Sequence, residues 1–296
     1  MLSIVIPVYN YDIFPLVKML MEEAISMKIS FEILCLDDAS DDMEIQINNK
    51  KIESFKNCYY EILPENIGRS MIRNKLVEIA HFDNLVFLDA DVLPTQQGFI
   101  KTYLNALAGN EIVFGGISYP KESDSLKQTL HYKYGKKREA LSFKKRSRTH
   151  SSNFTSANFA IKKELVQKIK FDESIKTYGF EDIMLSKELV LNGFKITQID
   201  NLVVHNGIIE NNNDYILKEH ESLETLYKLY VNKKIDNKNV RLISYYTLLK
   251  KIRISNLYLI FFQLIRKNLL INLRSKRPSL FLFDLYRLGY FCSIKY

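Results

Sequence analysis

The chain has 296 residues, 47% of them hydrophobic, and a formal net charge of +8. This hydrophobic content is sufficient to bury a full core, which excludes an intrinsically disordered protein. The charge is uneven, because residues 250–296 carry ten Lys or Arg against one acid, Asp284, so the other 249 residues are close to neutral.

The N-terminus and the cysteines indicate the cellular compartment. Residues 3–9 already have a strand pattern, without the basic leader, apolar region and cleavage site of a signal peptide. Cys35, Cys58 and Cys292 are too few and too scattered for a disulfide framework or a thiolate zinc site. We therefore expect a cytoplasmic protein with reduced thiols.

The first half of the chain alternates between strand and helix patterns. Apolar, β-branched runs predict strands over residues 3–9, 32–36, 59–63, 85–88 and 111–115. Apolar residues at helical spacing predict helices over residues 14–27, 68–81 and 94–107. Repeated β-α-β units predict an α/β protein with a mainly parallel sheet and helices on both faces.

The second half has a different character. Residues 132–150 are polar and strongly basic, flanked by His131 and His150, and we expect a mobile helix and loop there. Further strands are predicted at 158–161, 194–199 and 202–205, and helices at 163–169 and 183–191. Beyond Asn213 the pattern is helical to the end of the chain.

Two carboxylates follow the strand predicted at 85–88. Asp89 and Asp91 are separated only by Ala90, and residues i and i+2 of a strand share a face. Two hard oxygen donors on one side favour a divalent cation, Mn²⁺ or Mg²⁺. The simpler alternative is a pair of solvated turn residues.

Polar clusters also follow the first two strands. Tyr9 and Asn10 end the first, and Asp37 and Asp38 end the second. Ligands of parallel α/β sheets bind outside the carboxyl ends of the strands. Together with Asp89, these clusters predict a site for a diphosphate at one edge of the sheet.

The order and spacing of the motifs carry a resemblance over about residues 1–210. The matching segments are Ser3-Ile-Val-Ile-Pro-Val-Tyr-Asn10, Leu36-Asp-Asp-Ala-Ser40, Glu65-Asn-Ile-Gly-Arg69 with Arg73-Asn74, Asp89-Ala-Asp91, Ser156-Ala-Asn-Phe-Ala160 and Gly179-Phe-Glu-Asp182. In these the chain resembles a family 2 glycosyltransferase with the GT-A nucleotide-sugar-binding fold, of the inverting, non-processive bacterial type.

The resemblance implies a donor site and a division of the chain. Its nucleotide-sugar-binding residues would be Pro7, Tyr9, Asn10, Asp38, Arg69, Arg73, Asp89 and Ala90. Tyr9 would stack on the base, Asp38 would accept a hydrogen bond from it, and Arg69 or Arg73 would face the diphosphate. We expect a catalytic domain over 1–210, with its nucleotide-binding half at about 1–115 and its acceptor half at about 116–210, and a helical extension over 211–296.

The resemblance also implies the catalytic and metal-binding residues. Asp182 would be the general base and Glu181 its support, which implies inversion at the anomeric carbon by a single displacement. The alternative is that both acids only stabilise a helix N-terminus. Asp91 would bind the divalent metal, Mn²⁺ or Mg²⁺, and His205 is a weaker candidate ligand, since a His at a strand end is more often packed or on the surface.

The implied reaction moves one sugar from a nucleotide-diphosphate sugar, with UDP favoured, to an acceptor hydroxyl. A lipid-linked saccharide in surface polysaccharide synthesis is the expected acceptor. Two features depart from related sequences: Ala39 occupies a position where Gly is common, and the Gln-x-x-Arg-Trp signature of processive synthases is absent, as is any Trp.

Two other functions share some of these sequence features. A sugar-1-phosphate nucleotidyltransferase usually needs a Gly-rich loop with Arg near the N-terminus, and residues 7–12 contain neither. A non-enzymatic nucleic-acid-binding protein could use the basic, aromatic tail. The aliphatic residues of the tail fit a lipid surface or a partner helix better, so we expect no nucleic-acid partner.

The tail itself contains the apolar run 257–265, which is far shorter than the ~20 residues that span a bilayer. Its cations and aromatic residues predict a segment that lies on the cytoplasmic face of the cell membrane. The alternative is a pair of C-terminal helices that packs on the protein or forms a homodimer.

Overall fold

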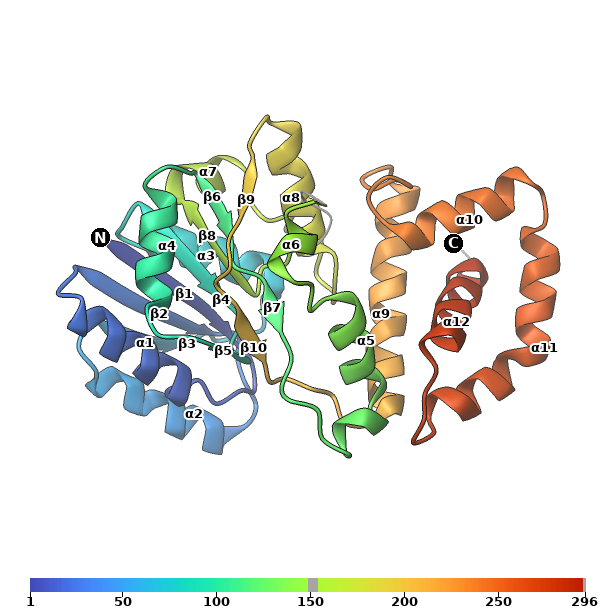
Figure 1. The fold of residues 1–296 in the computed structure, drawn as a ribbon, viewed down its shortest axis with the longest axis horizontal. Helices are drawn as coiled ribbons and strands as arrows, with labels where there is room; N and C mark the ends of the chain where they lie inside the picture. The colour runs from blue at the N-terminus through green and yellow to red at the C-terminus, as the bar shows by residue number, and fades with distance from the viewer. Residues whose placement is uncertain (149–153, 295–296) are drawn as a thin grey trace. The chain divides into compact units, whose positions relative to one another are not determined.

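The computed structural model describes residues 1–148 and 154–294 (Figure 1). It divides into two compact units. The first comprises Met1–Pro120, Glu139–Lys176 and Glu181–Gly207, and the second comprises Lys121–Arg138, Thr177–Phe180 and Ile208–Tyr296. The second unit thus includes Lys121–Arg138, Thr177–Phe180 and residues 208–210, which the sequence alone assigned to the domain at 1–210.

A seven-stranded sheet forms the centre of the first unit. Its strands are β1 (Leu2–Val8), β2 (Phe31–Asp37), β3 (Cys58–Ile62), β4 (Asn84–Leu88), β6 (Ile112–Phe114), β8 (Asn158–Lys162) and β9 (Ile196–Gln198). Their order is β3-β2-β1-β4-β8-β6-β9. Neighbouring strands are parallel except at β8, which runs antiparallel to β4 and β6. The predicted, mainly parallel sheet is confirmed.

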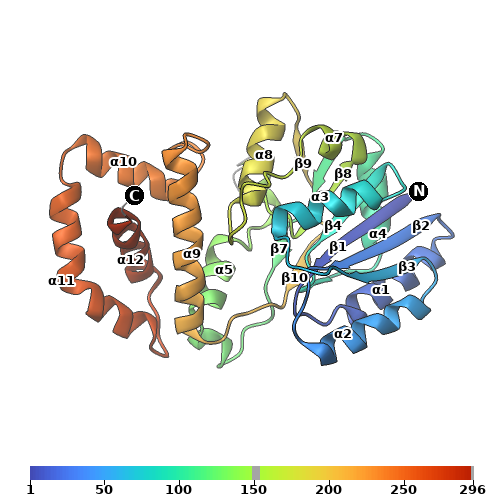
Figure 2. The same ribbon diagram turned by 180° about the vertical axis from the view of Figure 1, so that it is seen from behind.

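Helices cover both faces of this sheet. They are α1 (Phe14–Ser26), α2 (Met43–Lys50), α3 (Arg69–Ile79), α4 (Phe99–Leu107), α7 (Lys163–Lys168) and α8 (Glu181–Leu191), and a 3-10 turn follows α2 at Lys51–Ser54. Within this unit α4 lies in front of the sheet in Figure 1, and α3 lies in front of it in the reverse view of Figure 2. On the α3 side, Phe87 stacks on Phe159 in the core, with ring centroids 4.6 Å apart.

A second, three-stranded sheet also belongs to the first unit. Its strands are β5 (Val92–Pro94), β7 (Ile117–Ser118) and β10 (Val203–His205), with β10 in the centre. The predicted start of the helix at Pro94 is therefore wrong. Val92–Pro94 pairs with β10, and α4 begins only at Phe99. Pro94 lies on an edge strand, where its missing N–H breaks no ladder.

The basic stretch contains two helices in the described residues. It divides between α5 (Leu130–Arg138) in the second unit and α6 (Phe143–Arg146) in the first. Arg146 is buried and donates hydrogen bonds to the carbonyl oxygens of Gly115 and Ile199, at 3.0 and 2.9 Å. This residue fixes α6 to the sheet. His150 lies outside the described residues.

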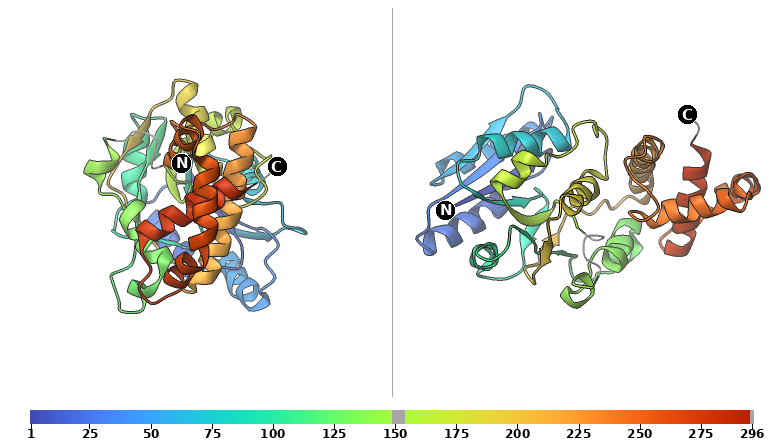
Figure 3. Two further views of the ribbon diagram at one scale, coloured as in Figure 1. Left: turned by 90° about the vertical axis from the view of Figure 1, so that its right-hand side faces the viewer. Right: turned by 90° about the horizontal axis from the view of Figure 1, so that it is seen from above.

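Helices make up most of the second unit. After a 3-10 turn at Leu126–Gln128 come α5 and then α9 (Asn212–Val231), α10 (Arg241–Lys251), α11 (Ser255–Leu273) and α12 (Leu280–Ser293), as expected beyond Asn213. Helix α12 packs among α9, α10 and α11 (Figures 1 and 3). A buried ion pair joins Arg287 to Glu219, with Nε and Oε1 2.6 Å apart.

No single helix of the described chain is long and apolar enough to cross a membrane. Helices α10 and α11 meet the criteria of length and composition only as a pair, and they are bent by 118°.

Candidate active site

The carboxyl ends of β1, β2 and β4 meet at one edge of the large sheet, here called the rim. Asn10 follows β1 in a left-handed conformation, with φ of 49°. Its side-chain oxygen accepts from the backbone N–H of Asp41, and its own N–H donates to Ser40, so it joins the ends of β1 and β2. Pro7 lies within β1, and Tyr9 is 52% exposed, which leaves its ring accessible for stacking.

Asp38 connects β2 to the start of α3. Its two carboxylate oxygens accept the backbone N–H groups of Ile67 and Gly68 at 2.7 and 3.0 Å. Burial raises the pKa of Asp38, while these hydrogen bonds oppose the rise. The carboxylate can accept further hydrogen bonds, since it has about four lone-pair sites. Asp38 therefore orders the loop that precedes α3 and keeps capacity for a ligand.

Arg73 links two motifs that are about ninety residues apart in the chain. Its side chain is 3% exposed, and Nη2 lies 2.5 Å from Asp89 Oδ1. Nη1 of the same guanidinium lies 3.7 Å from Glu181 Oε1. Burial alone would raise the pKa of Asp89, but the charges of Arg73 and Arg69 and the Arg73 hydrogen bond outweigh it and lower that pKa. Asp89 is therefore held as a carboxylate.

The structure distinguishes the two arginines that the sequence left as alternatives. Arg69, one turn before Arg73, has a side chain that is 46% exposed, with Nη1 3.7 Å from Glu181 Oε1. A guanidinium with this exposure can be reached by a solute. Arg73 is committed to the protein, so Arg69 is the better candidate for contact with a diphosphate.

Glu181 and Asp182 form the first turn of α8. Glu181 is buried, and one oxygen of Asp182 accepts the N–H of Ile183 at 2.7 Å. Burial and the neighbouring Glu181 carboxylate raise the pKa of Asp182 to about 7. A carboxylate with such a pKa can take up a proton near neutral pH, as a general base must. The position of both acids in the first turn of α8 also fits the helix-capping alternative.

Asp91 and His205 lie side by side because β5 and β10 pair. His205 is opposite Val92 in the register, and its Nε2 lies 3.4 Å from Asp91 Oδ2. Gly207 packs so closely that an added Cβ would lie 2.0 Å from the same oxygen. A carboxylate and an imidazole suit Mn²⁺, but among residues 1–148 and 154–294 no group of three or more ligating side chains gathers. Water and substrate oxygens would complete the coordination of a cation here.

Sequence reasoning missed three residues beside Asp91 or His205. Gly207 is one, and the Asn206-Gly207 pair after a predicted strand was a usable turn signal. Tyr11 is another, since burial and then the Asp91 charge raise its pKa. The third, Tyr119, stacks on His205 with ring centroids 5.4 Å apart. No sequence pattern indicated either tyrosine. His131 belongs to the second unit, where it stacks on Tyr215.

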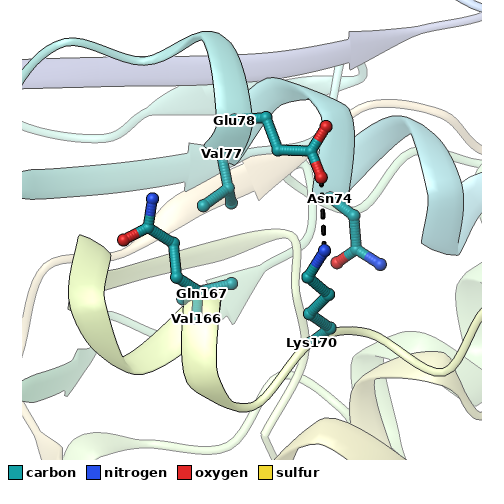
Figure 4. Close-up of a pocket in the computed structure, with 6 residues that line it drawn as sticks. All are labelled: Asn74, Val77, Glu78, Val166, Gln167 and Lys170. Carbon is teal, nitrogen blue, oxygen red and sulfur yellow. Dashed lines mark hydrogen bonds and ion pairs between the residues drawn. The ribbon is translucent and has the colours of Figure 1, made fainter.

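A pocket of about 260 Å³ lies elsewhere on the first unit, between α3 and α7 (Figure 4). Its lining consists of Asn74, Val77, Glu78, Val166, Gln167 and Lys170. The ion pair between Lys170 and Glu78, 3.2 Å long, lies within this group. None of the predicted site residues lines it.

The chain was compared with known proteins. The family model described as glycosyl transferase family 2 matches residues 3–170. A search of curated proteins found no match. Among solved structures, the mannosyltransferase PcManGT from Pyrobaculum calidifontis, in complex with GDP-Man and Mn²⁺, is similar with a TM-score of 0.52 at 16% identity, over 78% of this chain and 64% of that one.

Two further structures have lower scores. S. aureus TarS 1-349 has a TM-score of 0.47 at 16% identity, over 97% of this chain and 90% of that one. GalNAc-T7 with UDP, GalNAc and Mn²⁺ has a TM-score of 0.49 at 15% identity, over 69% of this chain and 43% of that one. The chain thus spans less than two thirds of PcManGT. The fold is GT-A, and because the family model covers more than half of its residues, the chain belongs to glycosyl transferase family 2.

Proposed function

We propose that this protein is an inverting glycosyltransferase that moves one sugar from a nucleotide-diphosphate sugar to an acceptor hydroxyl. The observation that carries the proposal is Arg73, which joins Asp89 to Glu181 and so brings the Asp89-Ala90-Asp91 and Glu181-Asp182 motifs to one rim. A transferase needs donor-binding and acceptor-activating groups close together, because orienting two reactants accounts for much of the rate gain.

The donor would lie across the carboxyl ends of the strands. Tyr9 would stack on the base, Asp38 would accept a hydrogen bond from its edge, and Arg69 would pair with the diphosphate. Asp89, kept ionised by Arg73, would accept from a ribose hydroxyl or from a water. UDP is the favoured nucleotide, because a carboxylate beside a stacking ring suits the imide N–H of uracil.

The metal site would consist of Asp91 and His205. Their oxygen and nitrogen donors fit Mn²⁺, and the Asp91 carboxylate also fits Mg²⁺. A divalent cation bound there supplies Lewis-acid stabilisation of the departing diphosphate. Complexes of PcManGT and GalNAc-T7 that contain Mn²⁺ are consistent with this choice.

Asp182 would remove the proton of the acceptor hydroxyl. Burial and then the Glu181 carboxylate raise its pKa to about 7, which suits proton exchange near neutral pH, and Arg69 and Arg73 hold Glu181 in place. The hydroxyl oxygen then attacks the anomeric carbon, the bond to the diphosphate breaks, and the configuration inverts.

The acceptor that we favour is a lipid-linked saccharide of surface polysaccharide assembly, with the protein on the cytoplasmic face of the membrane. The basic and apolar C-terminal helices support this choice. Nucleotidyl transfer is disfavoured by family membership and by the lack of a Gly-rich loop at 7–12.

A thermal-shift panel tests the proposal. UDP-sugars and GDP-sugars are added with and without Mn²⁺, and we expect a UDP-sugar with Mn²⁺ to stabilise most, by about 2.7 kcal/mol at one hundred times its Kd. A lack of stabilisation by every nucleotide sugar, both with and without Mn²⁺, would contradict the donor assignment. Stabilisation by a nucleoside triphosphate and a sugar phosphate alone would instead favour nucleotidyl transfer.

A further inference from the structure

Helix α11 in the second unit has two apolar stripes, and only one of them is covered. Phe262, Leu269 and Leu273 are buried in the core cluster that includes Phe283 and Tyr286 of α12. The other stripe is exposed, with Leu264 and Ile271 at 77% and 70%. Its remaining members are Leu257, Ile260 and Phe261.

The exposed residues lie on one side of the helix, in a row that is interrupted at Lys267 and Asn268. Three or four residues separate Leu257 from Ile260 and Phe261, and the same spacing separates these from Leu264. Ile271 follows Leu264 by two turns, so all five residues lie on one side of α11. Soluble proteins rarely expose contiguous apolar rows of this length without a partner.

Helix α10 and the following turn extend the apolar surface. Leu248 and Ile252 are exposed by about half, and Ile254 by 39%. Because α10 and α11 are bent by 118° and contact one another, these residues lie at the corner where the two helices meet. The row of α11 and this corner are here called the outer face.

Cations accompany the outer face. Lys267 and Arg274 each follow an exposed apolar residue, Leu264 and Ile271, by three positions and so lie on the same side of α11. Further exposed cations lie at the corner and beyond the end of the helix: Lys250, Lys251, Arg253, Lys276 and Arg277. Between residues 241 and 294 the single acid is Asp284, which already pairs with Arg138 at 2.5 Å.

We propose that the outer face docks on the anionic headgroup region of a lipid bilayer, with α11 lying parallel to the membrane. Leucine, isoleucine and phenylalanine on one side, with Lys and Arg beside them, are the composition of helices that rest at a lipid interface. The cations complement the negative surface of such a membrane. No span is required, which agrees with the failure of α11 alone to meet the criteria for crossing.

Two other occupants fit less well. A symmetric pair of chains would use the same patch on both copies, so that Lys267, Arg274 and the corner lysines of one would approach those of the other. A nucleic acid would favour aromatic rings for base stacking, whereas the outer face is mainly aliphatic. Lipid docking on α11 is independent of whether the rim transfers sugar.

The test is co-sedimentation of the full chain with vesicles of phosphatidylcholine alone and with increasing phosphatidylglycerol. We expect binding that rises with anionic lipid and is reduced, not abolished, by salt. The variant Leu264→Glu with Ile271→Glu should lose binding, because it places carboxylates in the row. Lys267→Gln with Arg274→Gln should weaken it roughly fivefold for each cation removed.

The matched control is Leu217→Glu, at an exposed leucine on α9 outside the row, which should bind as the unaltered chain does. Circular dichroism and nucleotide binding verify that each variant is folded. The proposal is overturned if the full chain ignores anionic vesicles or if the double Glu variant binds them equally well. It is also overturned if the double Glu variant changes only the sedimentation mass of the protein without lipid, which would assign the outer face to a contact between copies.

Discussion

The rim of the first unit and the outer face of the second are both rich in charged residues, but they differ in how those charges are held. At the rim, Arg73 is buried between Asp89 and Glu181, so these three charges have fixed opposite partners. On the outer face, Lys267 and Arg274 are exposed beside an apolar row. Buried, paired charges are costly to desolvate and tolerate little change, whereas exposed cations suit a diffuse, replaceable attraction.

The difference has a consequence for mutation. Substitutions at the rim should affect single steps strongly, because each residue there has a defined partner. Substitutions on the outer face should have graded effects, because each cation contributes a share.

The largest effect is expected at Asp182. Asp182→Asn removes the proposed base while keeping the shape of the side chain, so transfer should fall by roughly 10²- to 10⁴-fold with donor affinity unchanged. Initial rates with a competent acceptor and calorimetry of the donor measure the two quantities. Glu188→Gln, later on α8, is the matched control. Unchanged turnover in Asp182→Asn would place the base elsewhere.

Arg73 should have the largest effect on stability. Arg73→Met removes the cation between the buried Glu181 and the partly buried Asp89, which costs about 3–5 kcal/mol of unfolding free energy when a buried partner is left uncompensated. Arg69→Met, at a half-exposed position one turn away, should cost about 1 kcal/mol or less and instead weaken nucleotide binding. Urea denaturation compares the two variants. Equal losses of stability would contradict the distinction between a buried link and an accessible contact.

The pH dependence should follow Asp182. Because burial and Glu181 raise its pKa to about 7, the base is protonated below that pH and the rate of transfer should fall tenfold per pH unit. Glu181→Gln should move this limb to lower pH, since it removes the like charge. The profile is measured from about pH 5 to about pH 8, a range that includes the shifted pKa. A rate that does not change over this range would contradict the assignment.

The same shift has a stability counterpart. The folded pKa of Asp182 lies above its ordinary value of 3.8, so the unfolded chain releases this proton more readily. The contribution of Asp182 to the unfolding free energy is therefore complete at low pH, and it declines as the pH rises from about 4 to about 7. Asp182→Asn should flatten that decline in urea titrations at several pH values.

The smallest effect concerns the turn after β2. Ala39 has φ of 57°, a left-handed conformation that disfavours residues with a Cβ. Ala39→Gly should therefore raise the unfolding free energy by about 0.5 to 1 kcal/mol. Ala106→Gly, within α4, should lower it by about 1 kcal/mol and serves as the control of opposite sign. A loss of stability in Ala39→Gly would show that the turn is not strained.

The sequence was informative where the pattern is local. Strand β4 and the acids after it follow from an apolar run of four residues and a change to polar residues, and parallel β-α-β order then places Asp38 and Asp89 on the same rim. Helix α2 was missed, because Met43–Lys50 has little apolar periodicity and depends on contacts such as Asn49 with Tyr11.

The sequence could not predict which of Arg69 and Arg73 is buried and which is exposed. The two lie four residues apart on one side of α3, and which of them is buried depends on Phe171, whose ring lies 5.7 Å from the Arg73 guanidinium. The register between β5 and β10, which brings His205 to Asp91, is likewise a long-range pairing that no local pattern specifies.

Calorimetric titration of UDP with Mn²⁺ into the unaltered chain and into Asp91→Asn tests the central claim, a metal-dependent nucleotide site at the rim, most directly. The substitution removes the negative charge that a cation would need, so we predict measurable binding only in the unaltered chain and only with the metal present. Asp83→Asn, at an exposed acid before β4, should bind as the unaltered chain does. Equal affinity in the Asp91→Asn variant, or equal affinity with and without Mn²⁺, would contradict the account.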